Sequence, residues 1–175
     1  MGWHRAEPTT GWTGSPDRRA MKRLLHVGGL CLGALLVALQ LVPYGRDHTN
    51  PPVARDAPWS TPEGRRLAVS ACYDCHSNQT RWPLYSHVAP MSWLVQRDVE
   101  NGRRELNFSD WDGDNDVDDL AEVVGEGSMP PRNYRLLHPD ARLSESEKAA
   151  LIRELQALAD DGGDRDRRGS NRNGG

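Results

Sequence analysis

The longest apolar segment of the chain lies close to its N-terminus. Residues 24–42, LLHVGGLCLGALLVALQLV, contain only His26 and Gln40 as clearly polar members. A helix needs about 20 consecutive apolar residues to cross the hydrocarbon core of a bilayer, so this segment predicts a single transmembrane helix. Its exit, from Val37 to Pro43, lacks the small-residue pattern of a cleavage site. That favours an uncleaved anchor over the alternative, a cleaved signal peptide.

Basic residues beside the segment predict its orientation. Only Arg46 follows it closely, whereas several basic residues stand just before it: Arg18, Arg19, Lys22 and Arg23. Lys and Arg are retained on the cytoplasmic side of a membrane, so residues 1–23 are expected to form a basic cytoplasmic tail. The chain after residue 42 is then extracytoplasmic. Met21 is an alternative start to Met1, which leaves the length of the tail open.

Beyond the apolar segment the pattern changes to short stretches with helical spacing. Residues 43–59 carry a Pro-Pro pair and no apolar periodicity, which indicates a linker. The first helix is expected to begin at residues 60–63, Ser-Thr-Pro-Glu, which combine a capping hydroxyl, an early proline and a following glutamate. Apolar residues then follow on one face, and the helix leads directly into Cys72; they are Leu67, Ala68 and Ala71.

Three further helices are expected downstream. One begins at Pro90-Met91-Ser92 and ends near Asn101-Gly102, and a short one covers residues 120–124. The last begins with the capping box Ser144-Glu145-Ser146-Glu147 and ends at Gly162-Gly163. No stretch of alternating polarity predicts a strand, and the polar tail, residues 161–175, is expected to be disordered.

The folded domain is therefore expected to cover residues 60–160 and to be mostly α-helical with long loops. A domain of about 100 residues buries only around two-thirds of its surface, so a bound or covalent group is expected to complete its core. The net charge of the chain is -3, and no run rich in Lys and Arg is interleaved with aromatic residues in the folded part. This excludes nucleic acid as an expected partner.

One short motif, ACYDCHSNQT, places Cys72, Cys75 and His76 within five positions. A structural zinc site needs four ligands, usually two cysteine pairs, and only Cys72 and Cys75 lie outside the apolar segment. A thioredoxin-like pair belongs to a βαβ unit, and no strand is expected here. A simple disulfide between the two cysteines closes too small a loop to stabilise the fold and leaves His76 unexplained.

The sequence C-x-x-C-H is the attachment signature of c-type haem. On a helical turn, Cys72 and Cys75 project to the same side, so each sulfur can bond one of the two vinyl groups of the porphyrin. His76, the next residue, can then offer a ring nitrogen to the iron. We therefore expect one covalently attached haem c, whose apolar ring completes the core of a small cytochrome c-like helical domain with long loops.

The expected sixth ligand of the iron is Met129. It lies in GEGSMPP, where Gly125 and Gly127 allow close backbone approach and Pro130-Pro131 stiffen the loop. A thioether ligand raises the reduction potential of a haem. The alternatives that stay open are Met91, His87, His138 and an open site.

These residues resemble a known family, the small bacterial haem-binding domain proteins, which are membrane-anchored and have one C-x-x-C-H. The resemblance runs from Cys72 to Ile152, through CYDCHSNQTRWPLYSHVAPMSW, EVVGEGSMPP and LLHPDARLSESEKAALI. It implies covalent haem on Cys72 and Cys75, His76 as an axial ligand and a methionine-proline element at Met129. At His87 the chain departs from its relatives, which tend to have Asn there.

Two other features invite functional interpretation. Near the haem motif, Trp82, Tyr85 and Trp93 are expected to pack around the core rather than to relay electrons. The acidic run from Asp110 to Asp118 resembles a calcium loop but lacks the Gly and Glu at the required positions. A solvated acidic loop is the favoured interpretation there, and its charge could steer a basic redox partner.

The sequence thus predicts a membrane-anchored monohaem electron carrier, single-pass in the cell membrane, with its haem domain in the periplasm. The alternative function is a haem enzyme or sensor whose open sixth site takes peroxide or a diatomic gas. An enzyme would need a distal acid or base, for which only His87 and His138 are candidates. The carrier is favoured, with an unidentified redox partner protein and an oligomeric state that the sequence leaves open.

Overall fold

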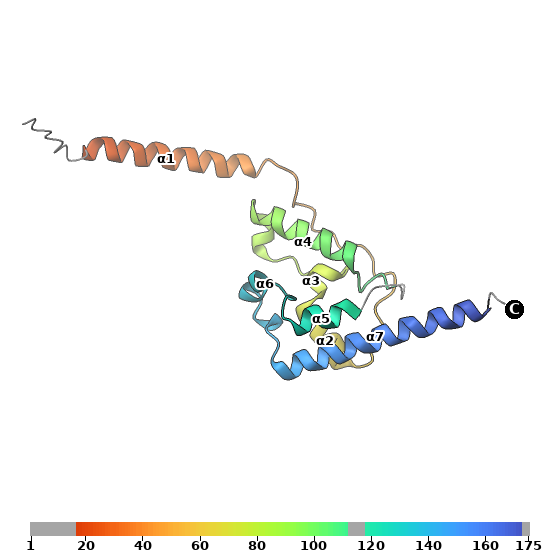
Figure 1. The fold of residues 1–175 in the computed structure, drawn as a ribbon. Helices are drawn as coiled ribbons and strands as arrows, with labels where there is room; N and C mark the ends of the chain where they lie inside the picture. Colours follow the sequence, from red (N-terminus) through yellow and green to blue (C-terminus); the bar gives the residue numbers. More distant parts are fainter. Residues whose placement is uncertain (1–16, 112–117, 173–175) are drawn as a thin grey trace, which may run out of the picture. The chain divides into compact units, whose positions relative to one another are not determined.

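The structure is a computed structural model, which describes residues 17–111 and 118–172. The chain divides into two units, residues 1–42 and residues 43–175, and each is described here by itself (Figure 1). The described part is mostly helical, as predicted, and contains no strand; an isolated bridge joins Arg55 and Asp110. The acidic run from Asp110 to Asp118, expected to be a solvated acidic loop, lies largely outside the described residues.

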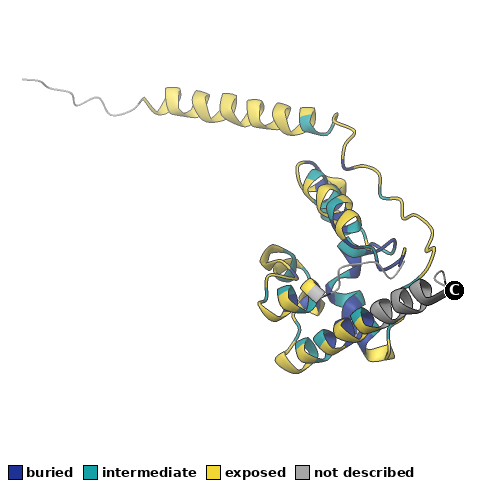
Figure 2. Cartoon of the chain, turned by 45° about the vertical axis from the view of Figure 1, so that its right-hand side comes forward, coloured by how far each residue is buried: buried dark blue, intermediate teal, exposed yellow. Residues whose placement is uncertain are grey.

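The first unit contains one helix, α1 (Arg18–Leu39). Its 22 residues have a mean hydropathy of 1.6 over the most apolar window, and none of them is buried (Figure 2). At 1.5 Å per residue the helix is about 33 Å long, enough for the hydrocarbon core of a bilayer. By length and composition α1 is therefore able to cross a membrane. Asp17 caps its first turn, because its carboxylate accepts a hydrogen bond from the backbone N–H of Arg19.

The second unit is built from short helices and two single turns. In chain order they are α2 (Pro62–Ala71), α3 (Tyr73–His76), η1 (Leu84–His87), α4 (Met91–Glu105), α5 (Asp118–Gly125), α6 (Arg132–Leu137), η2 (Pro139–Ala141) and α7 (Glu145–Arg172). Within the unit α7 packs against α2 and α5, and α3 packs against α4 (Figure 1). The C-x-x-C-H motif in α3 thus packs between α2 and α4, which come from different parts of the sequence.

Two of the predicted helix starts, those of α2 and α7, are confirmed by their capping bonds. Thr61 accepts a hydrogen bond from the backbone N–H of Gly64 at 3.0 Å, at the start of α2. At the start of α7, Glu147 accepts a bond from the Ser144 N–H at 2.9 Å, and Ser144 accepts one from the Glu147 N–H at 3.3 Å. These reciprocal bonds are the capping box that the sequence predicts.

Two predicted helix ends differ from the structure. The second predicted helix, expected to end near Asn101-Gly102, continues as α4 to Glu105. The last, expected to end at Gly162-Gly163, continues as α7 to Arg172. Both expected ends rest on glycine as a stop signal. A glycine inside a helix costs only about 1 kcal/mol relative to alanine, so glycine alone does not end a helix.

Residues 43–59, expected to be a linker, are hydrogen-bonded to the helical domain. Backbone bonds join this segment to the loop after α4: the Ala57 N–H donates to Phe108 O at 2.8 Å, and the Trp111 N–H donates to Arg55 O at 3.0 Å. A side-chain bond from Asn50 reaches Thr80 O at 2.9 Å. The segment is held by hydrogen bonds of its backbone and polar side chains, so no apolar pattern predicts these contacts. The second unit begins at Pro43 rather than at Ser60.

The core lies where this segment meets α2 and α7. Aromatic rings form one side of it, with Tyr73 stacked on Phe108 at 5.4 Å between centroids and Phe108 on Trp111 at 6.1 Å. Buried aliphatic residues of the helices form the other side: Leu67, Val124, Leu151, Leu155 and Leu158. Tyr73 directly follows Cys72, so the core fixes the start of the haem motif.

Candidate functional site

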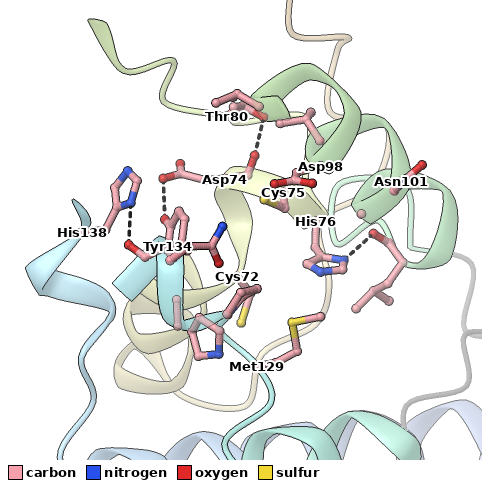
Figure 3. A pocket seen from close by; sticks show the side chains of 18 of the residues that line it. Cys72, Asp74, Cys75, His76, Thr80, Asp98, Asn101, Met129, Tyr134 and His138 are labelled. Carbon is pink, nitrogen blue, oxygen red and sulfur yellow. Dashed lines mark hydrogen bonds between the residues drawn. The ribbon is translucent and has the colours of Figure 1, made fainter. Parts of the chain in front are cut away.

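A cavity of about 460 Å³ lies between α3, α4, α5 and the segment that contains α6. Its lining is largely apolar and includes Cys72, Cys75, His76 and Met129, the four residues that the sequence predicts as the site (Figure 3). The volume falls within the range of cofactor pockets, about 300–1,000 Å³. The fold therefore brings all four residues to one pocket, although Met129 is far from the others in sequence.

The C-x-x-C-H motif forms a single helical turn. Cys72 ends α2 and begins α3, and its carbonyl oxygen accepts bonds from the N–H groups of Cys75 at 3.1 Å and His76 at 2.9 Å. Both thiols are free, so the disulfide alternative has no support in the structure. Burial raises the pKa of Cys72 and of Cys75 to about 12, which keeps both as neutral thiols.

His76 has one ring nitrogen available as a metal ligand, because a hydrogen bond holds the other. Its Nδ1 lies 3.3 Å from the carbonyl oxygen of Leu106, the residue that ends α4. With Nδ1 engaged as a donor, Nε2 is the nitrogen available to a metal ion. Burial lowers the pKa of the imidazole, which favours the neutral form that ligates metals.

Gly102 sets the distance between α4 and the motif. A Cβ atom at this position would lie 2.5 Å from the carbonyl oxygen of Cys75 and 2.9 Å from its carbonyl carbon. Only glycine permits so close an approach of α4 to α3. The same contact places the end of α4, with Leu106, beside the His76 ring.

Met129 is held by its backbone. The N–H groups of Ser128 and Met129 both donate to the carbonyl oxygen of Val123 at 3.1 Å, and Gly127 has a φ of +75°. That φ lies in the left-handed region, which glycine adopts without strain. The glycine predicted to shape this loop thus makes the turn that brings Met129 to the pocket, where its side chain is 41% exposed.

The alternative ligands are placed differently. Met91 and His138 line the same cavity, whereas His87 does not and instead packs edge-on against His48, with 4.2 Å between ring centroids. Both nitrogens of His138 have neighbours, because Nδ1 lies 3.0 Å from Tyr134 O and Nε2 lies 3.3 Å from the Tyr85 hydroxyl. Of the aromatic residues considered from the sequence, Tyr85 lines the cavity, and Trp82 stacks on His48.

A polar wall, formed by Asp74, Arg81 and Tyr134, was not predicted. All three residues line the cavity, and Arg81 and Tyr134 both bond to the Asp74 carboxylate (Figure 3). Asp74 and Tyr134 are 60 positions apart. Nothing in the spacing of the sequence points to this pairing, although Asp74 itself stands between the two cysteines.

The donors around the cavity fit a haem. Two thiols, a neutral imidazole and a thioether are groups of the kind that attach and ligate haem, and the largely apolar lining suits a porphyrin ring. Within the described part of the chain, no group of three or more His, Cys, Asp and Glu side chains could hold a metal ion. The zinc alternative therefore lacks a ligand set there.

Comparison with known proteins gives one result for the family. A family model described as a haem-binding domain matches residues 34–157. No curated protein and no solved structure matches the chain.

Proposed function

Because the chain belongs to the haem-binding domain family, we propose that it is a membrane-anchored c-type cytochrome that carries electrons. The observation that carries the proposal is the gathering of Cys72, Cys75, His76 and Met129 around one apolar cavity. In this proposal α2, α3, α4 and the Met129 loop form a cytochrome c-like domain around one haem. Bound haem would supply a one-electron couple at its iron.

The two thiols would make the attachment covalent. Each cysteine adds its S–H bond across one vinyl double bond, so that a sulfur–carbon bond forms and the hydrogen goes to the other vinyl carbon. Cys72 and Cys75 lie on the same helical turn, which matches two neighbouring vinyl groups. The addition would need no oxidant, because the hydrogen of each thiol stays in the product.

His76 and Met129 would be the two axial ligands. The Leu106 carbonyl orients the imidazole through Nδ1, and a hydrogen bond at that nitrogen also makes the ring a better ligand. Methionine as the partner of histidine raises the reduction potential. With both axial positions filled by protein, the site would exchange electrons rather than bind a substrate.

Localisation follows from α1. A helix able to cross the membrane, with basic residues at its start, supports a single-pass anchor with the haem domain in the periplasm. A partner protein that gives or takes the electron is required there. The alternative function, a haem enzyme or sensor, is favoured by one observation: Tyr85 and His138 place a hydroxyl and an imidazole on the wall of the same cavity.

The proposal is tested on the full chain produced with a cytochrome c maturation system. Haem should stay on the polypeptide during denaturing electrophoresis and be lost in a Cys72→Ala, Cys75→Ala double variant. Cys31→Ala is the matched control, because Cys31 lies in α1 and should not affect haem staining. The ferric protein should show the weak far-red band of sulfur-ligated low-spin haem c, and Met129→Ala should lose it and gain binding of carbon monoxide.

Met91→Ala is the control for the axial ligand, since Met91 lines the same cavity. Full haem staining in the double variant would refute covalent attachment. A wild-type protein that is high-spin and binds carbon monoxide readily would replace the carrier with the enzyme or sensor. If Met91→Ala loses the far-red band and Met129→Ala keeps it, the ligand assignment is wrong while the function stands.

A further inference from the structure

Asp74, the residue between the two cysteines, is buried and fully hydrogen-bonded. Its side chain is only 8% exposed. Oδ1 accepts bonds from the Arg81 N–H at 3.0 Å and from Arg81 Nε at 3.1 Å, and Oδ2 accepts from Arg81 Nη2 at 3.2 Å and from the Tyr134 hydroxyl at 2.7 Å. A carboxylate offers about four acceptor sites, so every one of them is used.

Three of these bonds come from Arg81 and one from Tyr134. The two donors differ in their distance from Asp74 along the chain. Arg81 follows the haem motif closely and bonds to Asp74 through both its backbone and its guanidinium, so this pair is local. Tyr134 belongs to α6, which lies 60 positions further along the chain, and it also lines the cavity. Of the four bonds to the Asp74 carboxylate, the Tyr134 bond is therefore the one that ties the C-x-x-C-H motif to a distant segment.

The segment that Tyr134 belongs to is the continuation of the Met129 loop. Only Pro130 and Pro131 separate Met129 from the first residue of α6, and proline fixes φ. The position of α6 therefore restricts the Met129 loop from its C-terminal side, while the bonds to Val123 O hold it from the other side.

No residue of α6 is buried, and Leu136 and Leu137 are 73% and 55% exposed. Apolar packing thus does little to hold this helix. Its C-terminal end continues into η2, where Ala141 is fully buried. In its N-terminal half, which is next to Met129, Tyr134 donates a short hydrogen bond of 2.7 Å to the buried Asp74 carboxylate. Burial, and next the Asp74 charge, raise the pKa of Tyr134, so the phenol remains a donor.

We propose that Asp74 is a positioning residue for Met129: by accepting the Tyr134 hydroxyl bond, it holds α6 and thereby the Met129 loop against the haem motif. The same pentapeptide would then supply both cysteines, one axial ligand and the attachment point of the segment that carries the other. The inference rests on the proposed function for the role of Met129, whereas the mechanical link itself depends only on the contacts.

Tyr134→Phe tests the link with the smallest change, since it removes one hydroxyl and leaves every haem-attaching residue intact. Tyr44→Phe is the matched control, because the Tyr44 hydroxyl also donates to a carboxylate, Glu100, at 3.0 Å, but Tyr44 does not line the cavity. Losing a hydrogen bond to a charged group shifts a local opening equilibrium by about tenfold or more. Both variants are compared as full-length holoprotein in detergent.

Two readouts are measured. Hydrogen exchange at the Ser128 and Met129 amides, which bond to Val123 O, should become about tenfold faster in Tyr134→Phe and stay unchanged in Tyr44→Phe. The far-red band should weaken and the affinity for carbon monoxide should rise by about the same factor, with haem staining unchanged. Adding Tyr134→Phe to an Asp74→Ala variant should have little further effect, because removal of the carboxylate has already removed the bond through which the two residues act.

The outcomes separate this inference from the proposed function. Unchanged exchange in Tyr134→Phe, with an intact far-red band, overturns the positioning role of Asp74. Faster exchange in a protein whose wild type has no far-red band supports the link and refutes Met129 as ligand. Absence of covalent haem in the wild type refutes the proposed function, and the exchange measurement on that protein still decides whether the link exists.

Discussion

At the scale of single residues, the packing of the C-x-x-C-H motif depends on Gly102, a residue without a side chain. Gly102 lies inside α4, where alanine would normally be preferred by about 1 kcal/mol. The Cys75 carbonyl oxygen occupies the space that a Cβ would need. Glycine at this position therefore serves the contact between two helices and not the helix that contains it.

We expect Gly102→Ala to separate α4 from α3 and to lower the free energy of unfolding by about 1–3 kcal/mol, as overpacking does in a close-packed interior. The yield of attached haem should fall with it, because His76 loses its register with Leu106. Gly125→Ala is the control, since a Cβ there would meet only Ile152 Cδ1 at 3.8 Å. Chemical denaturation and haem staining measure both effects, and equal stability of the two variants would contradict the steric argument.

At the scale of elements, α7 closes the start of α2. Glu154 of α7 is buried and accepts hydrogen bonds from the backbone N–H and the hydroxyl of Ser60 and of Thr61, at 2.6–3.3 Å. Burial acts to raise the pKa of Glu154, but these hydrogen bonds outweigh it and leave the pKa lowered. The carboxylate thus serves the free N–H groups at a helix N-terminus, although it comes from another helix.

Replacing Glu154 by Gln should destabilise the domain in a pH-dependent way. A folded-state pKa below the unfolded value stabilises the protein at pH values above the unfolded pKa, and this stabilisation is lost as the pH falls through the folded pKa. At pH 7 we expect a loss of about 1–2 kcal/mol in the free energy of unfolding, and a much smaller loss near pH 3. Urea denaturation at several pH values measures it; a loss that is constant with pH would show that the charge of Glu154 is not involved.

The same scale shows which elements sequence patterns can predict. The starts of α2 and α7 have capping residues followed by apolar faces, so the sequence pattern predicts where both helices begin. The short helix α6 was missed, because six residues are too few for a periodicity to be recognised. At Gly102 the sequence pattern suggested a helix end, whereas the glycine is there to let α3 approach. A packing requirement and a stop signal use the same residue type.

At the scale of the whole molecule, the sequence could predict four residues that line one cavity, but not the contacts that hold them in place. Cys72, Cys75 and His76 are recognisable because their chemistry needs adjacent positions, and Met129 because its loop has an unusual composition. The bond between Asp74 and Tyr134 depends on how α3 and α6 pack. Common polar residues far apart in the chain give no pattern for such a pairing before the fold is known.

The anchor makes a prediction about the complete chain. A reporter enzyme that is active only outside the cytoplasm, fused to the C-terminus, should be active, because in the proposed orientation the basic residues before α1 retain the N-terminus inside. Deleting residues 24–42 should abolish both reporter activity and haem staining, since the proposed attachment of haem c takes place on the outer side. Activity of a cytoplasm-specific reporter at the same position would refute the orientation and, with it, the covalent haem.

The bonds from Ser60 and Thr61 to Glu154 also bear on the order in which the protein is made. They join positions 93 and 94 residues apart, so the cap of α2 is incomplete until the chain has been synthesised through Glu154. Contacts between such distant positions form late, because a long loop must close first. During that interval Cys72 and Cys75 lie in a domain that has not closed. Helix α7, which also contributes Leu155 to the lining of the cavity, would thus complete the site in the last folding step.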